Sequence, residues 1–313
     1  MRWRLHSANR YWNADVQPDG CWGNRHRCRS RFTGSRRMAT SIGPLLSTSP
    51  SIGSQLRLIA ESLAREAGDM ALRGRKSGPL TATTKSSPID MVTKFDKASE
   101  AMITEGLAKI RPGDSIVGEE GAAKQGTSGI TWHIDPIDGT TNFYFDLPMW
   151  AVSIGAVDEH GPLAGAVYVP ALGEMFSGAR TEGSTLNGMS IGVRNNHDIA
   201  DALVCTGYSY RISEREVHAK RVADIVMKVR DIRRFGAAAV DLCFVACGRL
   251  DAYFEEHLHS WDLIAGQVIA TEAGAIISDY AGNPVTPAQV LAATPGVHAD
   301  LIRLIATSGQ GVS

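Results

Sequence analysis

The chain reads Asp135-Pro136-Ile137-Asp138-Gly139-Thr140-Thr141 at the point that decides its fold and its chemistry. We refer to residues 135–141 as the aspartate turn. An apolar run at residues 131–134 precedes it, so two carboxylates follow directly on a predicted strand. Proline fixes φ and has no N–H, which makes the turn rigid. The two aspartates can therefore converge on one hard cation, with the Ile137 carbonyl as a further oxygen ligand. If a helix begins after Gly139, its free N–H groups would bind a phosphate.

The spacing within the aspartate turn separates three interpretations. A plain acidic turn with capping carboxylates would need no metal. Haloacid-dehalogenase-like phosphatases carry Asp-x-Asp-Gly-Thr at a strand end and use the first aspartate as a covalent nucleophile. Here the spacing is Asp-x-x-Asp-Gly-Thr, and the extra residue moves the two carboxylates relative to the strand end. The covalent mechanism therefore fits poorly, and the choice between an acidic turn and a metal site depends on further residues.

Three other segments bring acidic side chains to the ends of predicted elements. Glu119 follows the short apolar run 116–117, either as a metal ligand or as part of a solvated acidic turn. Asp262 stands at the start of an apolar helix, where it could cap the helix or project into a metal site. Thr93 and Asp96 have the spacing of a capping box, and either side chain there can also help to deprotonate a water. Each of these segments alone is weak evidence for a metal site.

Composition narrows the class of protein. The chain has 313 residues, of which 43% are hydrophobic and 21% charged, with a formal net charge of −1. With so small a net charge, the electrostatic field of the protein as a whole does not favour a nucleic acid or a membrane as partner. No apolar run approaches the roughly 18 residues that span a bilayer. The five cysteines have no paired spacing, which predicts reduced thiols and a cytoplasmic location.

The first 37 residues differ from the rest of the chain. They hold nine arginines against two acidic residues, and no apolar stretch of a secretory signal follows the charges. An organelle transit peptide would fit this composition. A metal knuckle at Cys21, His26 and Cys28 would not, because the spacing matches no common zinc pattern. We predict that translation starts at Met38 and that residues 1–53 are a disordered or wrongly assigned extension.

The remaining residues, 54–308, divide into two halves with different periodicity. Residues 54–195 predict two amphipathic helices, one from Ser54 up to an irregular loop at 74–88 and one at 93–110, followed by short strands and a hairpin. Residues 196–308 alternate strand and helix. Stacked α and β layers are the natural way to bury both halves. We therefore predict one layered domain with an α+β half and an α/β half.

Together, these segments resemble the inositol monophosphatase family. The likeness covers about residues 54–308, the motifs occur in the family's order, and the aspartate turn is the most specific of them. The motifs that carry it are Gly118-Glu119-Glu120, Trp132-His133-Ile134-Asp135-Pro136-Ile137-Asp138-Gly139-Thr140-Thr141-Asn142-Phe143 and Trp261-Asp262-Leu263-Ile264-Ala265-Gly266, with support from Lys85-Ser86-Ser87-Pro88-Ile89-Asp90 and Gly236-Ala237-Ala238-Ala239-Val240-Asp241-Leu242.

The resemblance implies a five-layered αβαβα sandwich, usually a homodimer, that hydrolyses small phosphate monoesters with two or three Mg²⁺ ions. Glu119, Asp135 and the Ile137 carbonyl would hold the first ion. Asp135, Asp138 and Asp262 would hold the second, and a weaker third ion would use Glu119.

The resemblance also implies which residues activate the attacking water and which residues bind the substrate. Asp96 and Thr140 would orient and deprotonate the attacking water. Glu255 falls where the family contacts a sugar or inositol hydroxyl, and Ala238 falls where a backbone group does the same. The other expected substrate contacts are Asp138, Gly139, Thr140, Thr141 and Ser209, with Lys85 near the mouth of the site.

The substrate itself stays open at this point. Inositol-1-phosphate is the first candidate, while histidinol phosphate, fructose-1,6-bisphosphate and a 3′-phosphoadenosine nucleotide are alternatives for the same site. Glu255 favours a polyhydroxylated substrate over a nucleotide. Binding to RNA or to a transcription complex, a second role of some bacterial relatives, is an alternative of another class. Every expected ligand is present, so a dead enzyme and a nucleic-acid partner are not the expectation.

Overall fold

The computed structural model describes residues 50–78, 80–84 and 91–309. The predictions about Met38, about the extension up to residue 49 and about Lys85 therefore lie outside the described residues. The described residues belong to one unit of the chain.

The elements of the first half are two long helices followed mainly by strands. They are α1 (Ile52–Lys76), β1 (Ala82–Thr84), β2 (Met91–Thr93), α2 (Lys94–Ile110), β3 (Ser115–Gly118), β4 (Ala123–Lys124), β5 (Thr131–Asp138), α3 (Thr140–Tyr144), β6 (Ala151–Asp158), β7 (Gly161–Val169), β8 (Glu174–Ala179), β9 (Gly183–Leu186) and β10 (Met189–Ser190).

The elements of the second half alternate, as the periodicity predicts. They are the 3₁₀ turn η1 (Ile199–Asp201), β11 (Leu203–Thr206), α4 (Ile212–Val226), β12 (Asp231–Arg233), α5 (Ala238–Ala246), β13 (Ala252–Glu256), α6 (Ser260–Glu272), β14 (Ile276–Ser278), β15 (Gln289–Ala293) and α7 (Pro295–Thr307).

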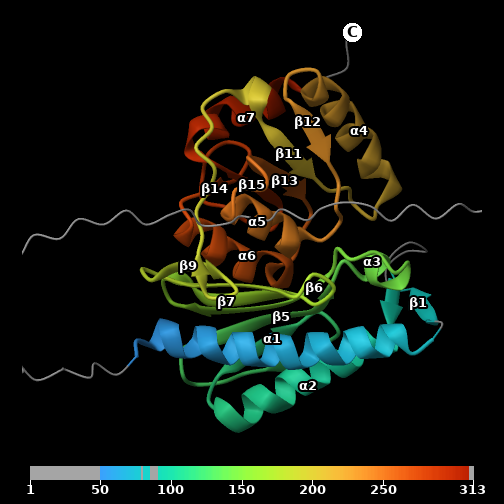
Figure 1. The fold of residues 1–313 in the computed structure, drawn as a ribbon, viewed down its shortest axis with the longest axis vertical. Helices are drawn as coiled ribbons and strands as arrows, with labels where there is room; N and C mark the ends of the chain where they lie inside the picture. The colour runs from blue at the N-terminus through green and yellow to red at the C-terminus, as the bar shows by residue number, and fades with distance from the viewer. Residues whose placement is uncertain (1–49, 79, 85–90, 310–313) are drawn as a thin grey trace, which may run out of the picture. The chain divides into compact units, whose positions relative to one another are not determined.

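These elements stack in five layers, α on β on α on β on α (Figure 1). Helices α1 and α2 cover one face of an eight-stranded sheet of order β10-β9-β8-β7-β6-β5-β3-β4. Helices α5 and α6 lie between this sheet and a five-stranded sheet of order β12-β11-β13-β15-β14, and α4 and α7 form the last layer. The layered α and β class predicted from the sequence is therefore confirmed.

Small residues let the middle layer come close to the large sheet, and this positions α6. A Cβ on Gly165 of β7 would lie 2.8 Å from the Cα of Ala265, and a Cβ on Gly155 of β6 would lie 2.8 Å from the Ala265 nitrogen. Any larger residue at either position would push α6 away from the sheet. This close approach brings the first turn of α6 to the end of β5.

The structure corrects several predicted boundaries. Helix α1 begins at Ile52 and continues to Lys76, past Gly74 where the loop was predicted to begin, and its Ser51 cap accepts a hydrogen bond from the Ser54 N–H (3.0 Å). Strand β5 does not end at residue 134 but continues through both aspartates, with a shift of its pairing register on β6 between Asp135 and Asp138. No helix of the described residues is long and apolar enough to cross a membrane.

Candidate active site

The aspartate turn lies where β5 slips in register against β6. Both carboxylates are buried, and Asp135 Oδ1 accepts a hydrogen bond from the Ile137 N–H (3.0 Å). Gly139 then takes the left-handed conformation (φ +84°), and a Cβ there would lie 3.0 Å from the Met149 carbonyl oxygen. Glycine is therefore needed both for the turn and for the close contact. The short helix α3 begins at the next residue.

Asp138 is fixed by the start of helix α5. Its two carboxylate oxygens accept hydrogen bonds from the Ala238 N–H (3.2 Å) and the Ala239 N–H (2.8 Å). A carboxylate is stabilised at this end of a helix, where free N–H groups meet the positive end of the helix dipole. The N–H of Ala238 is thus directed at Asp138, and a substrate contact by Ala238 would use its carbonyl or its methyl group.

Asp96 and Thr140 form a buried hydrogen-bonded pair next to the turn. The capping box predicted at the start of α2 is present, because Asp96 Oδ2 accepts hydrogen bonds from the N–H and the hydroxyl of Thr93 (2.8 and 2.6 Å). Oδ1 faces the Thr140 hydroxyl at 3.2 Å, and the same hydroxyl lies 3.1 Å from the Ile137 carbonyl oxygen. One aspartate therefore caps a helix and orients a threonine of the aspartate turn.

Two more carboxylates reach the same place from other elements. Glu119 follows β3 in a turn held by Glu100 of α2, whose carboxylate accepts the N–H groups of Glu120 and Ala122 (both 2.8 Å). Asp262 lies in the first turn of α6, where it accepts the N–H of residue 259 (2.6 Å). Asp262 is thus both a cap and a cavity residue, so the two interpretations of the sequence are compatible.

The four carboxylates line one cavity of about 1050 Å³ and repel one another. Burial raises the pKa of Asp135 well above its usual range, and the charges of Glu119, Asp138 and Asp262 raise this pKa further. Burial and the charge of Asp262 also raise the pKa of Asp138, although the hydrogen bond from Ala239 lowers it. Several carboxylates in so small a space are stable as anions only beside positive charge. All of the donors are hard oxygens, so the residues fit Mg²⁺ or a similar cation.

Glu255 at the end of β13 lines a second wall of the cavity, built from other elements than the aspartate turn. Its Oε2 accepts a hydrogen bond from the hydroxyl of buried Tyr253 (2.6 Å). A Cβ on Gly207 would lie 1.9 Å from both carboxylate oxygens of Glu255, so the absence of a side chain at Gly207 makes room for this carboxylate. Burial raises the pKa of Glu255, against the hydrogen bond from Tyr253 and the charge of Arg234, which both lower it.

The profile of the inositol monophosphatase family matches residues 53–310, nearly all of the described chain. The chain belongs to the inositol monophosphatase family. An inositol-1-monophosphatase of Mycobacterium leprae is 40% identical over 265 residues, which cover 78% of this chain and 90% of the relative. A protein of Pasteurella multocida named Nus factor SuhB is 37% identical over 251 residues, or 79% of this chain and 94% of the relative.

Solved structures agree with this assignment. The extragenic suppressor protein suhB from Bartonella henselae superposes with a TM-score of 0.77 and 29% identity, covering 81% of this chain and 99% of that one. Mycobacterium tuberculosis SuhB superposes with a TM-score of 0.70 and 38% identity, covering 83% and 99%. Membership of the inositol monophosphatase family makes this chain a phosphatase, and it confirms the resemblance found in the sequence.

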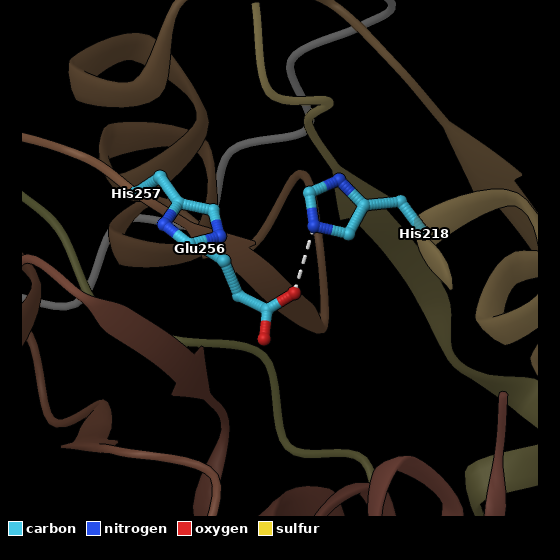
Figure 2. A group of neighbouring side chains, drawn as sticks. All are labelled: His218, Glu256 and His257. Carbon is cyan, nitrogen blue, oxygen red and sulfur yellow. Dashed lines mark ion pairs between the residues drawn. The ribbon is translucent and has the colours of Figure 1, made fainter. Parts of the chain in front are cut away.

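Within this family fold, a second group of titratable side chains includes Glu256 and His257, which line the cavity next to Glu255, and His218 of α4 (Figure 2). His218, Glu256 and His257 offer three possible metal-ligating atoms within 4.8 Å of one another. The bonding pattern favours an ion-pair network instead. His218 Nε2 contacts Glu256 Oε2 at 2.8 Å, and the Ser209 nitrogen lies 3.4 Å from His218 Nδ1. Arg221 Nη1 contacts the same oxygen at 2.5 Å and supplies the positive charge that a metal would bring.

Most of the predicted site residues line the cavity. Asp96 touches it only through Thr140, and Thr141 is not among the residues that line it. Ser209 lines the cavity, and its hydroxyl donates to Glu214 at the start of α4. The predicted residues that line it are Glu119, Asp135, Ile137, Asp138, Gly139, Thr140, Ser209, Ala238, Glu255 and Asp262.

Sequence reasoning missed the residues that hold Glu255. Tyr253 precedes Glu255 by two positions, and side chains two apart on a strand share a face, so this contact could have been anticipated. Gly207 carried no such signal, because it meets Glu255 only through the parallel pairing of β11 with β13, which aligns Thr206 with Phe254.

Proposed function

We propose that the protein is a Mg²⁺-dependent phosphomonoesterase that acts on the phosphate ester of a polyhydroxylated alcohol, with inositol-1-phosphate as the first candidate. The observation that carries this proposal is the convergence of four carboxylates, from β3, β5 and α6, beside the hydrogen-bonded pair of Asp96 and Thr140. We also expect a homodimer and a cytoplasmic location, as the family implies.

The metal would be held by residues of three segments. Glu119, Asp135 and the Ile137 carbonyl would hold one ion, and Asp138 and Asp262 would hold another together with Asp135. When bound, Mg²⁺ lowers the pKa of a water and neutralises charge on the phosphate and on the leaving oxygen. The mutual repulsion of Asp135 and Asp138 supports this assignment, because bound cations would relieve it while both carboxylates stay ionised.

Thr140 and Asp96 would take the proton of the attacking water. The two hydrogen bonds from Thr93 go to Asp96 Oδ2, and the Thr140 hydroxyl donates to Oδ1. Thr140 can therefore accept a proton from the water while it passes its own proton to Asp96. No histidine, cysteine or serine nucleophile is required, since water attacks phosphorus directly.

The rest of the cavity would bind the substrate. Backbone N–H groups of Gly139, Thr140 and Thr141 are assigned to the phosphate, as the family implies. Glu255 and Ala238 would contact hydroxyl groups of the alcohol, while Ser209 lines the wall beside them. An acidic acceptor such as Glu255 suits a molecule with several hydroxyl donors better than a nucleotide base with few.

A panel of substrates tests the proposal. Phosphate release from inositol-1-phosphate, fructose-1,6-bisphosphate, histidinol phosphate and a 3′-phosphoadenosine nucleotide would be measured with Mg²⁺ and with EDTA. We expect release with Mg²⁺ alone, and a higher kcat/KM for inositol-1-phosphate than for histidinol phosphate or the nucleotide. Turnover that persists in EDTA would overturn the metal assignment. Preference for the nucleotide would overturn the substrate class.

A second candidate rests on the names of relatives. The Pasteurella multocida relative is named as a Nus factor, so a binding role in a transcription complex could accompany or replace catalysis in this chain. Such a role would not depend on the carboxylates of the aspartate turn, and a variant that loses turnover separates the two functions.

A further inference from the structure

One face of helix α2 carries three buried polar side chains, and each of them contacts a segment of the proposed metal site. Asp96, Ser99 and Glu100 are spaced i, i+3 and i+4, so they lie together on one side of the helix. Asp96 accepts the Thr140 hydroxyl (3.2 Å), and the Ser99 hydroxyl donates to the Pro136 carbonyl oxygen (3.1 Å). Both contacts hold the aspartate turn, whereas Glu100 contacts the turn after β3.

Glu100 holds that second turn by its backbone. We refer to residues 118–122 as the glutamate turn. The two carboxylate oxygens of Glu100 accept the N–H of Glu120 and the N–H of Ala122, both at 2.8 Å. A Cβ on Gly118 would overlap Glu100 Oε2, so the carboxylate lies directly against the backbone of this glycine. A buried carboxylate that accepts two backbone N–H groups fixes the turn firmly, because hydrogen bonds to an ionised acceptor are the stronger ones.

The glutamate turn is also tied to strand β5. The parallel pairing of β3 with β5 ends with Gly118 beside Ile134, and the Glu119 N–H then donates to the Ile134 carbonyl oxygen (3.1 Å). Asp135 is the next residue of β5, so two proposed ligands of the first ion follow aligned positions on neighbouring strands. Strand β5 therefore holds the glutamate turn at its start, and α2 holds it at its end.

We propose that Glu100 is a positioning residue that fixes the distance between the glutamate turn and the aspartate turn, and thereby makes the first metal site selective for Mg²⁺ over Ca²⁺. The inference rests on the proposed Mg²⁺-dependent function and deepens it. Glu100 is not among the residues that line the cavity. It acts on the ion only through the backbone on which Glu119 stands.

Rigidity matters because the two ions differ in what they demand of their ligands. Mg²⁺ takes oxygen ligands at about 2.0–2.1 Å in near-octahedral geometry, whereas Ca²⁺ takes them at about 2.3–2.6 Å in flexible arrangements. A glutamate turn held by α2 keeps the Glu119 side chain close to Asp135, which suits the smaller ion. A turn released from α2 could adapt to either ion, so the site would lose Mg²⁺ affinity and keep most of its Ca²⁺ affinity.

Metal titration tests the inference without depending on turnover. Mg²⁺ and Ca²⁺ would each be titrated calorimetrically into the metal-free full chain in an Asp262→Asn background, which removes a ligand assigned to the second ion alone. In Glu100→Gln the amide keeps one acceptor and turns an N–H₂ group toward the other backbone N–H. We expect this change to raise the Kd for Mg²⁺ about tenfold or more, as for the loss of one charged hydrogen bond. The Kd for Ca²⁺ should rise less than about threefold.

A second variant disturbs the same contact from the other side. The methyl group of Gly118→Ala would displace the Glu100 carboxylate, so it should shift the ratio of the two Kd values in the same direction. It also tests the inference if Glu100→Gln does not fold. Together the two changes should shift the ratio by less than the product of their separate effects, because they break one contact. Glu105→Gln is the control, since Glu105 is an exposed residue of the same helix, and both ions should bind it as they bind the parent.

The other outcomes separate the inference from the proposed function. Equal losses for both ions, or no loss for either, would overturn the inference. A lower Tm in EDTA with unchanged Kd values would show a structural role only and would overturn it as well. If the wild type binds Mg²⁺ but releases phosphate from no ester, the proposed function fails while the titrations still test Glu100. If the wild type binds neither ion, the metal assignment and the inference both fail.

Discussion

The two walls of the cavity are built in different ways. The wall of the aspartate turn takes its side chains from the ends of regular elements, β3, β5, α2 and α6, and its groups are buried or half-buried carboxylates and one threonine. The other wall takes its side chains from the segment after β11, from the end of β13 and from the residues before α5. It mixes Glu255 with arginines, two tyrosines and histidines.

This difference links the first wall to the reaction itself and the second wall to substrate selectivity. The first wall packs like charges together at a cost in stability, and only a common task such as holding cations explains so much acid in so little space. The second wall neutralises its charges internally, through Glu214 with Arg211 and through Glu256 with His218 and Arg221. Substitutions should therefore abolish turnover on the first wall and shift substrate preference or stability on the second.

Asp135→Asn should give the largest effect. Because Asp135 is assigned to both ions, we expect turnover to fall on the order of 10³-fold. The same change removes one of several repelling charges, so in EDTA the variant should unfold at the same temperature as the wild type or higher. Phosphate release and thermal unfolding measure the two effects.

The surface substitution Asp201→Asn is the control for Asp135→Asn, because Asp201 pairs with Arg230 and neither residue lines the cavity. It should keep full turnover. Wild-type rates in Asp135→Asn would reject the two-metal site on the first wall. A transcription-complex role, if present, should survive Asp135→Asn unchanged.

Tyr253→Phe should give an intermediate effect confined to the second wall. The ring stays, but Glu255 loses its 2.6 Å hydrogen bond, and burial can then raise the pKa of Glu255 further. We expect KM for inositol-1-phosphate to rise about fivefold, the effect of one hydrogen bond, with kcat within about twofold. The rise should be larger at low pH, where Glu255 is protonated first, and steady-state kinetics from pH 6 to 8.5 would show this.

Tyr280→Phe is a matched control for Tyr253→Phe. Among the described residues the Tyr280 hydroxyl is buried without a hydrogen-bond partner, so its removal should leave KM unchanged. A fall of kcat with unchanged KM in Tyr253→Phe would contradict a positioning role for Tyr253.

The first wall could largely be predicted from the sequence, whereas only Glu255, Ala238 and Ser209 of the second wall were predicted, through the family resemblance. Asp135, Asp138 and Thr140 lie within six residues, and the Thr93–Asp96 capping box is local, so short motifs fix the geometry of these groups before any tertiary contact forms. Asp262 and Glu119 came from the family resemblance, since neither is decisive alone.

The second wall depends on tertiary contacts that no local pattern encodes. Gly207 faces Glu255 only because β11 and β13 pair in parallel, and His218 reaches Glu256 from a different element, α4. The predicted end of β5 was wrong for a similar reason. Its pairing with β6 resumes at Asp138 after a register shift, which depends on the partner strand rather than on the sequence of the turn.

Glu256→Gln should give the smallest effect, on stability alone. Burial by itself raises the pKa of Glu256, but the hydrogen bonds and charges of His218 and Arg221 outweigh it and hold this pKa at about 2. The folded-state pKa lies below the ordinary glutamate pKa of 4.5, so the carboxylate stabilises the fold above pH 4.5 and loses that contribution as the pH falls toward 2. We expect Glu256→Gln to lower Tm by roughly 5 °C at pH 7, and by progressively less below pH 4.5.

The exposed pair of Glu216 and Lys220 provides the control for this prediction, because Glu216→Gln removes a similar ion pair at the surface. Exposed pairs contribute little, so this variant should match the wild type at every pH. If Glu256→Gln and the wild type differed by the same Tm at pH 7 and at pH 3, the loss would come from packing rather than from charge, and the ion-pair network of the second wall would not be what stabilises it.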